Sequence, residues 1–135
     1  MIRLPDWEDR LARYLSEVAD APHAYGSHDC ALHGANAVLA QTGEDYAARF
    51  RGRYSTEIGA ARALKRYGAG DLAATVDQVL PERPIGHARR GDLVMVGGMV
   101  GVCIGADALF VGEQDDVAGL VRFPRADWAR CWGVG

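Results

Sequence analysis

The stretch RGDLVMVGGMVGVCIG, residues 90–105, decides the fold of this chain. It holds two short apolar runs, residues 93–96 and 100–104, which are separated by Gly97 and Gly98. Short apolar runs bounded by glycine predict β-strands. The segment PERP at residues 81–84 breaks the helical pattern before it, because proline cannot continue a helix. The chain therefore changes from helices to strands just ahead of this stretch.

Strands are predicted from here to the end of the chain. Further short runs lie at residues 109–111, 120–123 and about 130–134, again separated by glycine or polar residues. Together with the first two runs they predict an antiparallel β-meander.

Apolar residues at three- and four-residue steps predict helices before residue 81. The first helix is expected from its N-cap Asp6 to about Asp20. The others are expected from about Cys30 to Thr42 with Gly43 behind it, from Ser55 or Thr56 to Gly68 with Ile58, Ala61, Leu64 and Tyr67 on one face, and from Asp71 towards Leu80. Helices first and strands afterwards predict one α+β domain over residues 1–135, its N-terminal helices packed on one side of the C-terminal sheet.

The composition excludes several classes of function. Hydrophobic residues at 49% and charged residues at 24% give no sign of disorder. A net charge of −3 provides no broad positive field, so nucleic acid is not expected as a partner. No apolar run approaches the length of a signal sequence or a membrane span, so we expect synthesis in the cytoplasm. The arginines either contact an acidic partner or form a solvated face; they are Arg49, Arg51, Arg53, Arg89 and Arg90.

The cysteines at positions 30, 103 and 131 are widely spaced and odd in number, which predicts reduced thiols and no disulfide framework. Cys103 and Cys131 lie among apolar residues and are expected to be packing residues. Cys30 follows the polar segment GSHD, residues 26–29, in the first turn of a predicted helix. There the helix dipole and free backbone N–H groups favour the thiolate, and Gly26 leaves room for a close backbone approach. A small buried cysteine at a helix start is the simpler alternative.

The order of motifs along the chain resembles the NlpC-type papain-like cell-wall peptidases. Asp29-Cys30 at a helix start is followed by the Gly91-Asp92-Leu93 segment and then by the run at residues 100–105. In that family a Gly-Asp-Leu strand precedes a His-Val-Gly-Ile strand. The flanking features look like a phage- and prophage-encoded branch known from tail gene clusters; they are Trp7, Tyr25-Gly26, Thr42-Gly43-Glu44-Asp45, Arg51-Gly52-Arg53-Tyr54 and Gly59-Ala60.

The resemblance implies a papain-like fold with Cys30 as nucleophile, a histidine base on the second strand and a polar orienting residue on the third. Here Met99 stands at the histidine position, and the third position falls near Val111. Methionine cannot accept a proton, and valine cannot orient an imidazole. Two of the three catalytic positions are therefore degenerate.

Other histidines offer weaker alternatives. His33, three residues after Cys30, could approach the sulfur from its own helix, and His28 could do so from the preceding loop, although it is also an ordinary position for a solvated residue. His28, Cys30 and His33 could instead bind zinc, but a closed site needs a fourth ligand and the spacing fits no standard motif. No cofactor is expected. Asp92 is expected to bond local backbone at the start of its strand.

The resemblance and the residues around Cys30 leave three functions open, and the association with a phage tail is implied by the resemblance alone. The first is a structural or assembly component of a phage or prophage tail tip with a degenerate peptidase site. The second is an active cysteine hydrolase, an endopeptidase or amidase of peptidoglycan peptides, that uses Cys30. The third is a small metal-binding module. The resemblance implies tail-tip or hub proteins, and peptidoglycan, as partners, and the virion tail as the final location.

Overall fold

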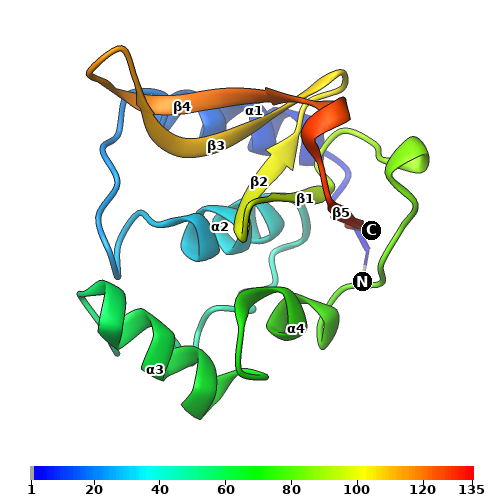
Figure 1. The fold of residues 1–135 in the computed structure, drawn as a ribbon. Coiled ribbons are helices and arrows are strands. Elements are labelled where there is room, and N and C mark those ends of the chain that lie inside the picture. The colour runs from blue at the N-terminus through cyan, green and yellow to red at the C-terminus, as the bar shows by residue number, and fades with distance from the viewer. Residues whose placement is uncertain (1) are drawn as a thin grey trace.

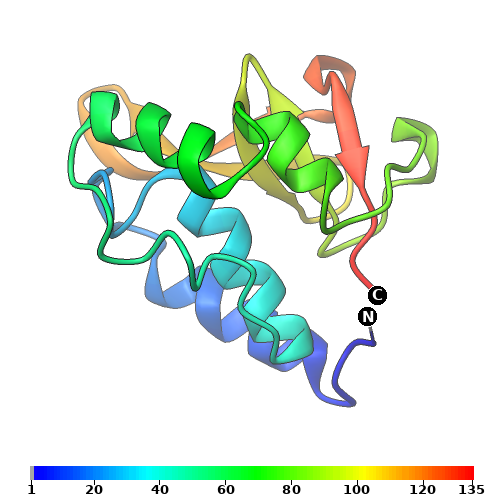
Figure 2. The same ribbon diagram turned by 90° about the horizontal axis from the view of Figure 1, so that it is seen from below.

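The computed structural model describes residues 2–135 and has helices in its first part and strands in its second. The helices are α1 (Trp7–Glu17), α2 (Cys30–Thr42), α3 (Glu57–Tyr67) and α4 (Leu72–Asp77). In Figures 1 and 2, α2 lies between α1 on one side and α3 and α4 on the other. This arrangement confirms the predicted α+β class.

Local signals fix both ends of α2. The side chain of Asp29 accepts a hydrogen bond from the Leu32 N–H at 2.9 Å, which caps the start of the helix. Gly43 ends the helix in the left-handed conformation, with φ at 78°, as favoured at a helix C-terminus. Both boundaries are those predicted from the sequence.

The other helices correct the sequence prediction in detail. Helix α1 ends at Glu17 rather than near Asp20, and Asp6 occupies the N-cap without a capping side-chain bond. Thr56 caps α3 and Asp71 caps α4. Ile58, predicted on the inner face of α3, is 67% exposed. Ala63 is the buried residue of α3, and the predicted Ala61, Leu64 and Tyr67 line a cavity beside the helix.

The sheet has the strands β1 (Leu93–Val96), β2 (Met99–Cys103), β3 (Asp107–Gln114), β4 (Val117–Pro124) and β5 (Arg130–Trp132). Their spatial order is β4-β3-β2-β1-β5, and each neighbouring pair is antiparallel. The first four strands form the predicted meander. The last does not continue it, because β5 returns to the far edge and pairs with β1, placing Trp132 opposite Leu93.

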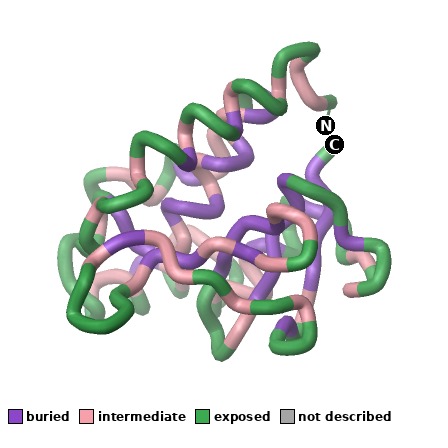
Figure 3. Tube along the Cα trace, turned by 90° about the horizontal axis from the view of Figure 1, so that it is seen from above, coloured by how far each residue is buried: buried purple, intermediate pink, exposed green. Residues whose placement is uncertain are grey.

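Both faces of the sheet are covered. On one face Leu93, Val100 and Val102 pack with Leu11, Ala37 and Val38 of α1 and α2. On the other face Val94, Phe110 and Cys131 pack with Ala88 and Trp128, which belong to non-helical segments. Figure 3 shows the buried stretches of the chain between these layers. The prediction that the helices pack on one side of the sheet is confirmed, and non-helical segments cover the opposite face.

The packing of α2 on the sheet depends on Gly34. A Cβ atom at this position would lie 2.8 Å from Cγ1 of Val100 and 3.3 Å from Cδ1 of Leu93. The missing side chain lets α2 approach β1 and β2 closely, which sets the position of Cys30 one turn earlier. None of the described helices is long and apolar enough to cross a membrane.

We therefore expect Gly34→Val to lower the free energy of unfolding by about 2 kcal/mol, because the added methyl groups meet a filled core. Urea denaturation measures this loss. Gly86→Val is the matched control, since nothing lies within 4 Å of a Cβ at Gly86. Equal stability of the two variants would contradict the close packing described here.

Candidate functional site

Cys30 is the first residue of α2, and Asp29 holds the surrounding segments in place. One carboxylate oxygen of Asp29 accepts from the Leu32 N–H, and the other accepts from the Gly26 N–H at 3.0 Å and the Tyr54 hydroxyl at 2.6 Å. Gly26 has φ at 85°, and a Cβ there would overlap the carbonyl oxygen of Tyr54. Gly26 was expected to leave room for a substrate, but the backbone of Tyr54 occupies that space and joins the loop before Cys30 to the segment before α3.

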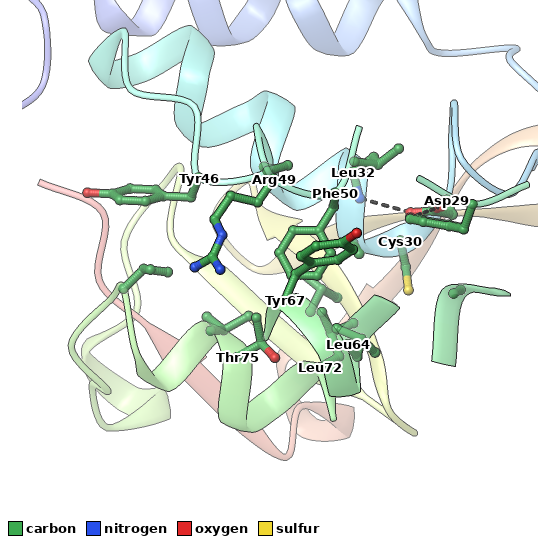
Figure 4. Close-up of a pocket in the computed structure, with 18 of the residues that line it drawn as sticks. Asp29, Cys30, Leu32, Tyr46, Arg49, Phe50, Leu64, Tyr67, Leu72 and Thr75 are labelled. Atoms are coloured by element: carbon green, nitrogen blue, oxygen red, sulfur yellow. Dashed lines mark hydrogen bonds between the residues drawn. The ribbon is translucent and has the colours of Figure 1, made fainter. Parts of the chain in front are cut away.

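Cys30 opens into a cavity of about 620 Å³. Its walls come from α2, the segment 45–54, α3, α4 and the strands β1 and β2. Most of the lining is apolar or aromatic; it includes Leu32, Phe50, Leu64, Tyr67, Leu72 and Val100. Figure 4 shows Phe50 and Tyr67 in the middle of this space, with Cys30 to one side of them. A cavity of this size and character is typical of a small-molecule or peptide-side-chain site.

The thiol of Cys30 is favoured over the thiolate. Burial raises its pKa above the ordinary value, and the negative charge of Asp29 acts in the same direction. The backbone N–H groups of Val100, Ala31 and Cys30 act in the opposite direction, but burial is the larger effect. The sequence predicted a stabilised thiolate from the helix start alone. That prediction is wrong because the walls of the cavity remove water from the sulfur.

His33 is fully buried and lies between α1 and β3. Its Nε2 is 3.0 Å from the carbonyl oxygen of Leu109, which can only accept, so Nε2 carries the proton. Nδ1 then accepts from the Tyr14 hydroxyl at 2.7 Å. Burial lowers the pKa of His33 to about 4. Both ring nitrogens are occupied, so the arrangement gives His33 a structural role and does not support it as a base for Cys30.

His28 corrects another expectation. It was predicted as a possible base or as a solvated loop residue, but only 9% of it is exposed, and its Nε2 has no hydrogen-bond partner among the described residues. Its ring meets that of His33 edge-on, with ring centres 5.9 Å apart. Burial lowers the pKa of His28. Within residues 2–135 no three His, Cys, Asp or Glu side chains gather as a metal site would require, so His28, Cys30 and His33 do not form the zinc site considered above.

The two degenerate positions lie on neighbouring strands. Met99 begins β2, directly before Val100, whose N–H acts on the Cys30 thiol. Met99 is 37% exposed and is paired with Val96, which packs on the face of the sheet away from α2, so the Met99 side chain lies on the opposite face from Val100. Val111 is buried in β3 and has an apolar side chain. Neither residue can exchange a proton with Cys30.

Sequence reasoning singled out Cys30 but not the aromatic and basic side chains of the cavity. Phe50, Tyr54 and Tyr67 line it, and Arg49 extends into it between Tyr46 and Thr75 in Figure 4. The signal available was the spacing of Tyr46, Phe50 and Tyr54 in a segment that is otherwise polar. Large aromatic residues at regular intervals in a loop indicate that one side of the loop packs against the rest of the domain.

Fold and site together define the class of protein: a small α+β domain whose central helix presents a cysteine to a largely apolar cavity, where burial raises the pKa of its thiol. Residues 2–134 match the family described as a domain of unknown function, DUF6950, and the chain belongs to this family. No curated protein matches the sequence. The family description assigns no activity, so the function has to be argued from the site.

Proposed function

We propose that this chain is a non-catalytic papain-like module of the NlpC type that binds a ligand or partner through the cavity beside Cys30. One observation carries the proposal: within residues 2–135 no histidine ring hydrogen-bonds to the Cys30 sulfur, and both ring nitrogens of His33 are engaged elsewhere, while burial raises the pKa of the thiol. A cysteine hydrolase needs a thiolate or a base that can generate one. The apolar cavity in front of the sulfur supports a binding role.

The expected context is a phage or prophage tail tip, where the module is a structural or assembly component beside hub proteins. This part of the proposal rests on the resemblance of the motifs described above. Mass spectrometry of purified tails tests it directly, since a stoichiometric component is present in every preparation and a contaminant is not.

An active cysteine hydrolase acting on peptidoglycan peptides is the second candidate. It is favoured by the thiol lining the cavity and by the N–H groups of Val100 and Ala31 beside it, which could also stabilise an oxyanion. The two candidates differ in the ionisation of Cys30 at neutral pH.

We expect the rate of Cys30 alkylation by iodoacetamide to rise with pH beyond the ordinary thiol value of about 8.5, because burial disfavours the thiolate. Peptide mapping separates Cys30 from the buried Cys103 and Cys131, and Cys30→Ala provides the blank. A wild-type rate that is already maximal below pH 7 would favour the hydrolase, and peptidoglycan turnover lost in Cys30→Ala would establish it.

A further inference from the structure

Unpaired arginines surround one end of the cavity. Arg49 lines the cavity, and the guanidinium carbons of Arg53 and Arg66 lie 5.6 and 5.5 Å from the ring centre of Tyr67. In the part of the chain that the structure describes, none of these arginines forms an ion pair. The whole chain has a net charge of −3, so this end is a local excess of positive charge.

The carboxylates of the cavity do not neutralise that end. Asp45 is paired with Arg51 at 3.0 Å, and Asp29 accepts three hydrogen bonds. Glu57 is the first residue of α3 and Tyr67 the last, so Glu57 lines the cavity at the end away from Tyr67, together with Tyr25, whose pKa is raised by partial desolvation and by the Glu57 charge. The cavity therefore has a negative end beside Tyr25 and a positive end at Arg49.

The space between the two ends is apolar. Leu64 and Leu72 line it from α3 and α4, and Leu93 and Val100 line it from the sheet. A volume of about 620 Å³ is within the range of small-molecule sites. Figure 4 shows the Arg49 guanidinium on one side of Phe50 and Tyr67 and the Cys30 sulfur on the other.

We propose that this cavity binds an apolar chain that ends in a carboxylate, as in a fatty acid. The carboxylate lies at Arg49, where a guanidinium can donate two hydrogen bonds to it, and the chain extends past Phe50 and Tyr67 towards Cys30. Glu57 opposes the reverse orientation. This inference rests on the proposed binding role of the cavity and names the class of its ligand.

The test is a calorimetric titration with dodecanoate below its micelle concentration, compared with dodecyltrimethylammonium. We expect dodecanoate to bind at least tenfold more tightly than the cation, since both offer the same apolar chain. Arg49→Gln is expected to weaken dodecanoate binding threefold to tenfold, a modest factor because Arg49 is partly in water. Arg13→Gln, which removes an exposed arginine on α1, is the matched control and is expected to change nothing.

A second variant and a second readout locate the bound chain. Ala61 lines the cavity and is itself exposed. Ala61→Phe therefore fills the cavity and is expected to abolish binding without disturbing the core. Bound dodecanoate is expected to slow the alkylation of Cys30 at least threefold. Equal affinity for both detergents, binding unaffected by Arg49→Gln, or unprotected Cys30 would overturn the assignment. The proposed non-catalytic role is judged separately, by the pH dependence of Cys30 alkylation in the absence of ligand.

Discussion

Asp92→Ala is expected to lower the free energy of unfolding by about 3–5 kcal/mol, the usual loss when a buried ion pair is broken. The carboxylate of Asp92 is fully buried at the start of β1. It accepts from the backbone N–H of Arg89 at 2.9 Å and of Val134 at 3.0 Å. It also pairs with Arg83 at 3.2 Å and, more distantly, with Arg3 at 3.8 Å.

The expected loss of stability is large because Asp92 connects the N-terminal and C-terminal segments of the chain. Arg3 belongs to the N-terminal segment and Val134 to the C-terminal one, and Figure 1 shows the two termini side by side. Removing the carboxylate leaves the partly buried guanidinium of Arg83, the buried N–H of Val134 and the partly buried N–H of Arg89 without their acceptor. Arg83 depends most on Asp92, since its buried Nε has no other partner in the part of the chain that the structure describes.

Urea denaturation at neutral pH measures the loss. Asp107→Ala is the control, because the Asp107–Arg122 pair is 3.5 Å long and largely in water, with 36% and 65% of the side chains exposed. We expect that control to lose less than about 1 kcal/mol. Asp92→Asn should fall between the two, because it keeps the shape and one oxygen but turns an amide donor towards other donors. A loss in Asp92→Ala no greater than in Asp107→Ala would show that the cluster contributes little.

The elements that sequence reasoning placed well are those with local signals. Asp29 caps α2 and Gly43 ends it, and each residue acts within its own turn of chain. The sequence also predicted that Asp92 bonds to nearby backbone, and in the structure its carboxylate accepts from the Arg89 N–H. Its link to Val134 could not be foreseen, because 42 residues separate the two along the chain.

The predictions that failed concern properties set by packing between segments that are far apart in the sequence. The run at residues 130–134 predicted a strand, but its pairing with β1 follows from where Trp132 packs, which the local pattern does not contain. Likewise the sequence placed Cys30 at a helix start but misjudged its pKa, since the sulfur is desolvated by walls that α3 and β2 contribute. His28 and His33 were read as candidates for chemistry because burial cannot be seen from spacing.

His33 offers a direct test of that burial through the pH dependence of stability. Its pKa is lowered from 6.5 to about 4 in the folded protein, chiefly by burial, with the neighbouring His28 acting in the same direction. The folded state therefore holds the ring neutral, while the unfolded chain binds a proton below pH 6.5. Stability from this residue is fully present above pH 6.5 and is lost as the pH falls towards 4.

The expected loss is about 3 kcal/mol, because each pKa unit corresponds to about 1.4 kcal/mol. His33→Gln removes the titrating group but keeps one donor for the Leu109 carbonyl and one acceptor for the Tyr14 hydroxyl. This variant is expected to be less stable than wild type at pH 7 and to lose about 3 kcal/mol less than wild type between pH 7 and pH 4.

Urea denaturation at a series of pH values gives both quantities, and the difference between the two curves removes the contribution of the carboxylates. His87→Gln is the control, because His87 lies exposed before β1, and its curve should follow wild type. Parallel curves for wild type and His33→Gln would mean that the imidazole reaches water in the folded protein. His33 would then be free to serve Cys30, and the non-catalytic proposal would lose its main structural support.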